Sequence, residues 1–157
     1  MSKKYYLTTA IPYVNAAPHI GFALELVQAD VVARWQRQRG REVFFLTGAD
    51  ENSLKNVQAA EAERLGVQEF VDRNSERFIE LCRALNISND DFIRTSSRGH
   101  HEGASAFWQA CRSEDIYRKS YQGLYCVGCE TFYLPKDLVD GSFPEHRTVP
   151  ETVIEEN

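Results

Sequence analysis

The sequence lacks the features that would place the protein in a membrane or outside the cell. Its 157 residues contain no apolar run of about 18 residues, the length that crosses a bilayer as a helix. The first residues, MSKKYYLTTAIPY, have no sustained apolar stretch and no small-residue cleavage site, so they do not resemble a signal peptide. We therefore expect a cytoplasmic protein with no membrane partner.

The chain also has no excess of positive charge, no internal repeat and no low-complexity segment. Its 23 acidic residues outnumber its 18 lysines and arginines, which argues against wholesale coating of nucleic acid. The apolar fraction of 43% and the charged fraction of 26% are those of a globular chain rather than a disordered one. The length suffices for one domain with a small appendage, but hardly for two full domains.

The order of the first segments predicts an α/β fold. Residues 4–10, KYYLTTA, predict a buried strand, and residues 43–46, VFFL, predict a second strand. The segment 19–40 between them predicts a helix with one apolar stripe, formed by Leu24, Val27, Val31 and Trp35. A strand, a helix and a second short apolar strand in this order are typical of a right-handed, parallel unit of a doubly wound sheet.

The pattern continues with a second helix, a third strand and a further helix. Residues 67–85 predict an amphipathic helix, residues 92–95 a short strand, and residues 98–112 another helix. From about Asp115 onward the sequence changes to aromatic and glycine-rich hairpin signals, so we place a domain boundary there. Four residues are expected to be buried on their type alone, namely Trp35, Trp108, Cys82 and Cys111.

The loop between the first strand and the first helix, PYVNAAPHIGF, is the first candidate site. Ligands of open α/β sheets bind at the carboxyl ends of the strands, and backbone N–H groups at a helix start bind phosphate. Gly21 allows close approach to the backbone, and His19 is placed to hydrogen-bond a phosphate oxygen. For an isolated His-x-Gly, a helix cap and a packing glycine explain the same residues.

In its context this loop resembles the "HIGH" signature of class I aminoacyl-tRNA synthetases, in the form found in the methionyl-tRNA synthetase family. The resemblance continues through ALELVQADVVARWQRQRG, FFLTGADEN, DDFIRT and GLYCVGCETFY, in the family's order and spacing. It implies that residues 1–114 form the first half of a doubly wound, Rossmann-like catalytic domain. Residues 115–157 would begin the inserted connective peptide domain, which carries a zinc knuckle in that family.

The resemblance implies activation of methionine by ATP to methionyl-adenylate, with Mg²⁺ accompanying ATP, and transfer of the methionyl group to tRNA(Met). Because the methionine carboxylate is already ionised near neutral pH, this step needs positioning and charge stabilisation rather than a general base. The family's ATP-binding positions correspond here to Pro18, His19, Ile20, Gly21 and Phe22. His19 and Gly21 would be catalytic, whereas Phe22 stands where a second histidine is usual.

Three further positions correspond to the family's methionine site. Asp50 would hold the α-amine by charge-assisted hydrogen bonds, and Ile11 and Tyr13 would line the pocket for the thioether. The next residues depart from the family, because Asn52-Ser53 replaces the commoner His-Gly. From the residues alone, Asp50 is also explained as the N-cap of a following helix.

The pair Cys126 and Cys129 lies in a hairpin context and supplies half of a tetrahedral zinc site. In a redox-active Cys-x-x-Cys pair a helix is expected directly after the cysteines, whereas ETFYLPKD predicts a strand. The family often closes the site with Cys-x-x-His; here His146 is present, but Phe143 stands in the place of the third cysteine. Bound Zn²⁺ would be weak and structural, with water or a carboxylate such as Glu145 at the fourth corner, and otherwise His146 is a solvated loop residue.

The family's Lys-Met-Ser-Lys-Ser loop and its helical anticodon-binding domain do not occur in these residues. We therefore expect the chain alone to activate methionine poorly, to need the remainder of a synthetase as its partner, and to expose a sheet face and edge. Two other interpretations stay open at this point. One is another HIGH-type nucleotidyltransferase, although TGADEN and the cysteine pair speak against it, and the other is a non-catalytic zinc-knuckle binding module.

Overall fold

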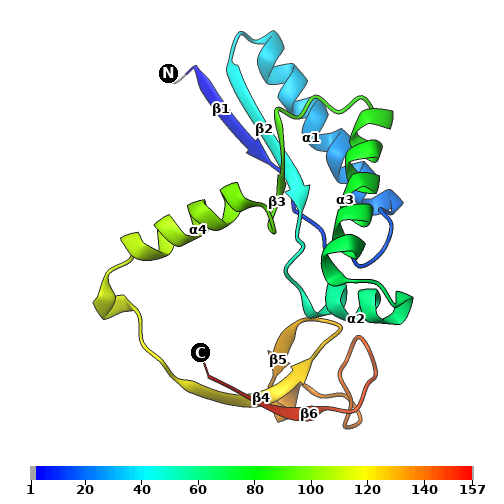
Figure 1. Cartoon of the computed structure of the whole chain (residues 1–157), viewed down its shortest axis with the longest axis vertical. Coiled ribbons are helices and arrows are strands. Elements are labelled where there is room, and N and C mark those ends of the chain that lie inside the picture. Colours follow the sequence, from blue (N-terminus) through cyan, green and yellow to red (C-terminus); the bar gives the residue numbers. More distant parts are fainter. Residues whose placement is uncertain (1–2, 157) are drawn as a thin grey trace. The chain divides into compact units, whose positions relative to one another are not determined.

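A computed structural model of the chain describes residues 3–156 (Figure 1). These divide into two compact units, one reaching to Ser105 and one beginning at Ala106. The helices and strands in chain order are β1 (Lys4–Thr8), α1 (Ile20–Gln38), β2 (Glu42–Ala49), α2 (Leu54–Glu63), α3 (Val67–Ala84), β3 (Asp91–Arg94), α4 (Arg98–Ala110), β4 (Ser120–Cys126), β5 (Thr131–Tyr133) and β6 (Glu151–Glu156). The domain boundary near Asp115 stays a prediction, since helix α4 itself crosses from one compact unit into the next.

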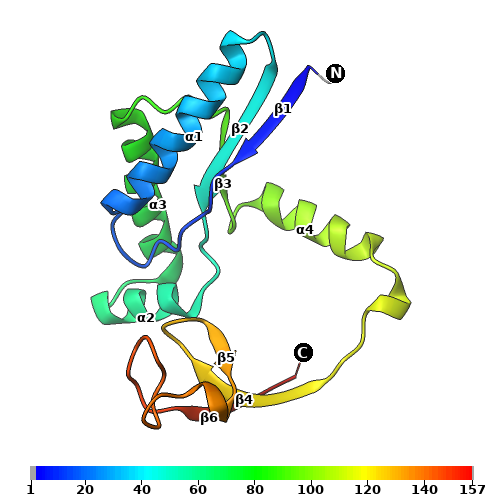
Figure 2. The same ribbon diagram turned by 180° about the vertical axis from the view of Figure 1, so that it is seen from behind.

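The first unit is built on a parallel sheet with the strand order β1-β2-β3, which confirms the predicted α/β class. Helices α1 and α3 lie on the same side of this sheet (Figures 1 and 2). The expectation that the first strand is buried is wrong: its side chains alternate between half-buried and exposed, and Tyr6 is 63% exposed. The physical reason is that β1 is an edge strand of the described sheet and successive side chains of a strand point to opposite faces.

The apolar stripe of the first helix is also exposed rather than buried. Between 41% and 61% of each of its members, Leu24, Val27, Val31 and Trp35, is accessible to solvent. Helix α1 instead buries another face, formed by Phe22, Leu26, Asp30, Ala33 and Gln36. Trp108 is exposed and lies in α4, of which no residue is buried, and Cys111, which follows that helix, is exposed as well. The expectation of burial is therefore wrong for Trp35, Trp108 and Cys111.

Polar residues on the buried face of α1 attach the helix to the segment that leads into β3. The Asp30 carboxylate accepts hydrogen bonds from the Ser88 amide at 2.7 Å and from Arg34 Nε at 2.6 Å. Arg37 donates to Asp90, whose carboxylate also accepts the Phe45 amide at 2.7 Å. Although burial alone raises the pKa of Asp30, these hydrogen bonds lower it below its ordinary value.

The apolar core of the first unit lies between the helices and the loop after β1. Its buried members are Val14, Phe22, Leu26, Ala49, Ala60, Phe70, Val71, Phe78 and Cys82. The rings of Phe22 and Phe78 meet edge to face, with centroids 5.3 Å apart. Cys82 is buried as expected, and this burial raises the pKa of its thiol.

The second unit is a small antiparallel sheet with the order β5-β4-β6. Leu124 in the central strand pairs with Tyr133 on one side and with Thr152 on the other. The segment after the cysteine pair is a strand, as predicted, and not the helix that a redox pair would want. The Phe143 ring is 2% exposed and lies 5.1 Å from the Tyr133 ring, so it belongs to the core of this unit.

Over the described range, no helix combines the length and the apolar character that crossing a bilayer requires. This agrees with the absence of a long apolar run in the sequence. The cytoplasmic location stays a prediction.

Candidate functional site

The loops that follow β1 and β2 meet at the carboxyl edge of the parallel sheet. Tyr13 and Asp50 form a parallel β-bridge, and the Asp50 amide donates to the Pro12 carbonyl oxygen at 2.9 Å. The hydroxyl groups of Thr9 and Thr47 hydrogen-bond to each other at 2.7 Å. The structure thus joins the two loops that carry most of the predicted ligand-binding residues.

His19 is the N-cap of helix α1. Its Nδ1 accepts a hydrogen bond from the Gly21 amide at 3.0 Å, so the proton of the neutral imidazole lies on Nε2. An Nε2–H group is a donor, as a phosphate oxygen requires. A Cβ at position 21 would come within 2.9 Å of the His19 ring, so a glycine is needed for this arrangement. The cap and the phosphate-binding role are therefore compatible, because they use different nitrogens.

A cavity of about 290 Å³ lies beside this loop, and its walls include Tyr13, Asn15, His19, Phe22 and Phe78. Phe22 is 5% exposed, and its ring packs on Phe78 in the core. An apolar ring at position 22 is thus part of the packing, whereas an imidazole there would need a polar partner. Of the neighbouring positions predicted to bind ATP, Pro18 is half-buried and Ile20 is 89% exposed.

Asp50 has one carboxylate oxygen engaged within the protein. Its Oδ1 accepts from the Asn52 amide at 3.0 Å and from the Thr95 hydroxyl at 3.2 Å. The Thr95 hydroxyl is oriented for this, because it accepts the Glu51 amide hydrogen at 2.7 Å. The interpretation of Asp50 as a helix cap is not needed, since Ser53 caps α2 by accepting from the Lys55 amide.

The other predicted methionine-site residues lie in the loop after β1. Ile11 is 36% exposed and Tyr13 is half-buried. The Lys55 ammonium group lies 5.4 Å from the centre of the Tyr13 ring, within the range of a cation–π contact.

Sequence reasoning missed the buried carboxylate next to Asp50. The Glu51 side chain is fully buried and accepts hydrogen bonds from the Ser75 and Ser96 hydroxyls and, at 2.7 Å, from Arg94 Nε. Burial by itself raises the pKa of Glu51, but these hydrogen bonds outweigh it and hold the pKa below the ordinary value. Only the acidic pair Asp50-Glu51 at a strand end could have pointed to it.

Acid is expected to destabilise the first unit. Because the pKa of Glu51 is lower in the folded chain than its ordinary value of 4.5, its contribution is present above that value and is lost as the pH falls through the lowered pKa. Asp30 acts in the same direction relative to its ordinary value of 3.8. We expect the urea midpoint to fall between about pH 6 and about pH 3. In a Glu51→Gln variant the urea midpoint should fall less over this pH range. An equal fall in the variant and the wild type would show that Glu51 does not contribute to the acid sensitivity.

Cys126, Cys129 and His146 come together in the second unit, with one ligand atom of each within 4.8 Å of the others. His146 Nδ1 lies 3.7 Å from Cys126 Sγ and 3.2 Å from Cys129 Sγ. A sulfur and a nitrogen atom that share a tetrahedral zinc ion are about 3.6 Å apart, and one of these two distances is longer and the other shorter than that. The Cys129 amide donates to Cys126 Sγ at 3.4 Å, which shapes the turn.

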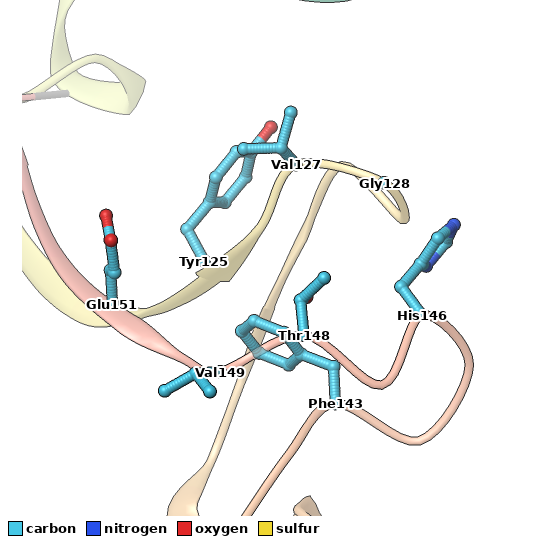
Figure 3. Close-up of a pocket in the computed structure, with 8 residues that line it drawn as sticks. All are labelled: Tyr125, Val127, Gly128, Phe143, His146, Thr148, Val149 and Glu151. Carbon is cyan, nitrogen blue, oxygen red and sulfur yellow. The ribbon is translucent and has the colours of Figure 1, made fainter.

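Gly128 makes room for the imidazole in this cluster (Figure 3). A Cβ at position 128 would come within 2.5 Å of the His146 ring. The three donors fit zinc in chemistry and spacing, and Phe143 contributes a buried ring instead of a fourth donor.

Comparison with known proteins connects these features. The profile of the family described as "tRNA synthetases class I (M)" matches residues 5–152. A methionine–tRNA ligase of Rhizobium meliloti is 50% identical over 130 residues, which are 82% of this chain and 25% of that protein. A methionine–tRNA ligase of Streptomyces coelicolor is 42% identical over 99% of this chain and 31% of its own length.

The same relationship is seen among solved structures. The Mycobacterium tuberculosis methionyl-tRNA synthetase in complex with methionyl-adenylate matches with a TM-score of 0.90 and 41% identity, covering 99% of this chain and 31% of that one. The chain thus spans between 25% and 31% of the length of these relatives. Because the profile matches residues 5–152 and these relatives are 41% to 50% identical, the chain belongs to the class I tRNA synthetases of the methionine (M) family.

Proposed function

We propose that this chain carries the amino-terminal part of the site in which a methionine–tRNA ligase forms methionyl-adenylate from methionine and ATP. The observation that carries the proposal is the joining of the His19 loop to Asp50 through the Tyr13–Asp50 bridge. The relative of known structure with methionyl-adenylate bound, at 41% identity, supports the same substrates. Transfer of the methionyl group to tRNA(Met) then follows from membership of the family.

His19 and the start of α1 provide the phosphate-binding part of the proposed site. The Nε2–H of His19 and the backbone amides at the start of α1, other than the Gly21 amide that His19 Nδ1 accepts, are donors for phosphate oxygens, on which charge builds as the methionine carboxylate attacks. Gly21 keeps the imidazole folded over this turn. Pro18, Ile20 and Phe22 border the nucleotide only through the backbone and the loop shape, and Mg²⁺ would accompany ATP.

Asp50 provides the amine-binding part. Because Oδ1 is held by Asn52 and Thr95, Oδ2 is the oxygen left to accept a hydrogen bond from the α-ammonium group of methionine. Ile11 and Tyr13 supply apolar surface for the thioether side chain. No general base is needed, because the attacking carboxylate is already ionised near neutral pH.

Zn²⁺ is the cofactor we propose for the second unit, held by Cys126, Cys129 and His146. Its role there is structural, since it would close the hairpin between β4 and β5 onto the loop that carries His146.

The proposal is tested by calorimetric titration of the 157-residue chain with methionine and with ATP. We expect Asp50→Asn to weaken methionine binding at least tenfold, because a charge-assisted hydrogen bond is lost, while ATP binding is unchanged. Asp91→Asn, which changes an exposed carboxylate at the first residue of β3, serves as the control. Methionine affinity that is equal in wild type and Asp50→Asn would contradict the role of Asp50. If the folded wild type binds neither ligand, the site is assembled only together with the remainder of a synthetase.

The same polypeptide by itself is expected to catalyse methionine-dependent pyrophosphate exchange at least about 10²-fold more slowly than a full-length relative. The reason is that the lysine loop of the family, which stabilises charge on the phosphates, is not among its residues. Exchange at the rate of the full-length enzyme, measured with labelled pyrophosphate, would show that these residues suffice. The remainder of a synthetase is therefore proposed as the partner needed for activity.

A further inference from the structure

We propose that the carboxylate of Glu145 is the fourth ligand of the metal ion held by Cys126, Cys129 and His146. This inference rests on the zinc site of the proposed function and adds a ligand outside the three-residue cluster. Structural zinc sites are almost always tetrahedral with four protein donors, so a cluster of three is incomplete.

Phe143 cannot complete the site, although it stands at the spacing of a ligand. Its side chain has no donor atom, and its ring is buried against Tyr133. It anchors the loop that follows, because its amide donates to the Thr148 carbonyl at 3.1 Å and its carbonyl accepts from the Arg147 amide at 2.9 Å. Glu145 and His146 lie within this closed loop.

Glu145 lies on the Cys129 side of the cluster, outside the set of ligand atoms that already lie within 4.8 Å of one another. Its Oε2 lies 3.5 Å from Cys129 Sγ, the separation of about 3.5 Å expected between a carboxylate oxygen and a thiolate that share a zinc ion. The side chain is exposed, so it can turn toward the ion without disturbing the core. Carboxylate oxygen is an accepted zinc ligand and is ionised near neutral pH.

Tyr133 is the competing neighbour, with its hydroxyl 3.3 Å from Cys129 Sγ. The hydroxyl donates its hydrogen to the sulfur, which is the geometry of a group that orients a ligand rather than that of a ligand. We therefore infer that Tyr133 orients Cys129 and that Glu145 is the metal ligand.

The test compares Glu145→Gln, Glu151→Gln and Tyr133→Phe with the wild-type chain. Glu151 is a matched control, because it lines the same pocket but lies across it from His146 (Figure 3). Zinc affinity is measured by competition with a chromophoric chelator, and coordination is measured from the visible absorption of the Co²⁺-loaded proteins. Since Glu145 is exposed, its substitution should leave the fold intact, which circular dichroism of the metal-free proteins checks.

We expect one equivalent of zinc in the wild type, a loss of affinity of at least tenfold in Glu145→Gln, and a shifted Co²⁺ spectrum in that variant alone. Wild-type affinity and spectrum in Glu145→Gln would overturn the ligand assignment while leaving the three-residue zinc site in place. If the Co²⁺ spectrum shifts in Tyr133→Phe and not in Glu145→Gln, the fourth ligand is Tyr133 and the assignment of Glu145 is wrong. A wild-type chain that binds neither metal would overturn both the inference and the zinc site.

Discussion

Alanine in place of Gly48 should lower the free energy of unfolding of the first unit by about 3 kcal/mol or more. Gly48 lies in β2 and pairs with Ile93 of the parallel neighbour β3. A Cβ at position 48 would overlap the carbonyl oxygen of Ile93 and its Cγ2 atom. Because the overlap involves backbone, no side-chain rotation relieves it, and β3 must move away from β2.

The measurement is urea unfolding followed by circular dichroism, together with hydrogen exchange of the β3 amides. Gly103→Ala is the matched control, because a Cβ at position 103 in α4 has no neighbour within 4 Å and alanine favours a helix. We expect that control to unfold at the wild-type urea concentration or slightly above it. If Gly48→Ala unfolds with the wild-type midpoint and retains protected β3 amides, the close β2–β3 packing is not essential.

The second large effect is expected for Glu51→Gln, which should lower the free energy of unfolding of the first unit by about 3 kcal/mol. The substitution keeps the shape of the side chain but removes the charge that faces Arg94. A fully buried carboxylate that accepts from two serine hydroxyls and a guanidinium cannot be replaced by a neutral amide, whose NH₂ group would face those donors. The strand end that carries Asp50 should loosen as a result.

Asp72→Asn provides the comparison, because it removes the other carboxylate that contacts Arg94. The Asp72 side chain is 50% exposed, so its ion pair is screened and is worth at most about 1 kcal/mol. Urea midpoints of the two variants should therefore differ clearly. Equal losses would show that burial does not decide the strength of the two ion pairs.

The sequence alone predicted the α/β class, the parallel order of the first strands and the strand after the cysteine pair. These features are encoded locally, in the apolar run at 43–46, the helical spacing after His19 and the hairpin residues around Cys126 and Cys129. The placement of His19 at the start of α1 and of Asp50 just after β2 also followed from the sequence, because both belong to recognisable segments.

The burial of side chains depended on contacts between distant segments. Periodicity found the apolar stripe of α1 but not the face that packs. The buried face includes the polar residues Asp30 and Gln36, and the Asp30 carboxylate is bound by Ser88, which lies far along the chain. Long-range contacts likewise decided that Trp35 and Cys111 are exposed.

The details of the site were decided by tertiary structure for the same reason. The hydrogen bonds of Asp50 to Thr95, of Glu51 to Ser75 and of Asn74 to Val14 join residues far apart in the chain, and no local pattern specifies them. The sequence thus determined which residue types lie at the strand ends and in the knuckle. The tertiary structure decided which of their atoms are held by the protein and which face a ligand, because hydrogen-bond partners are set only when distant segments pack.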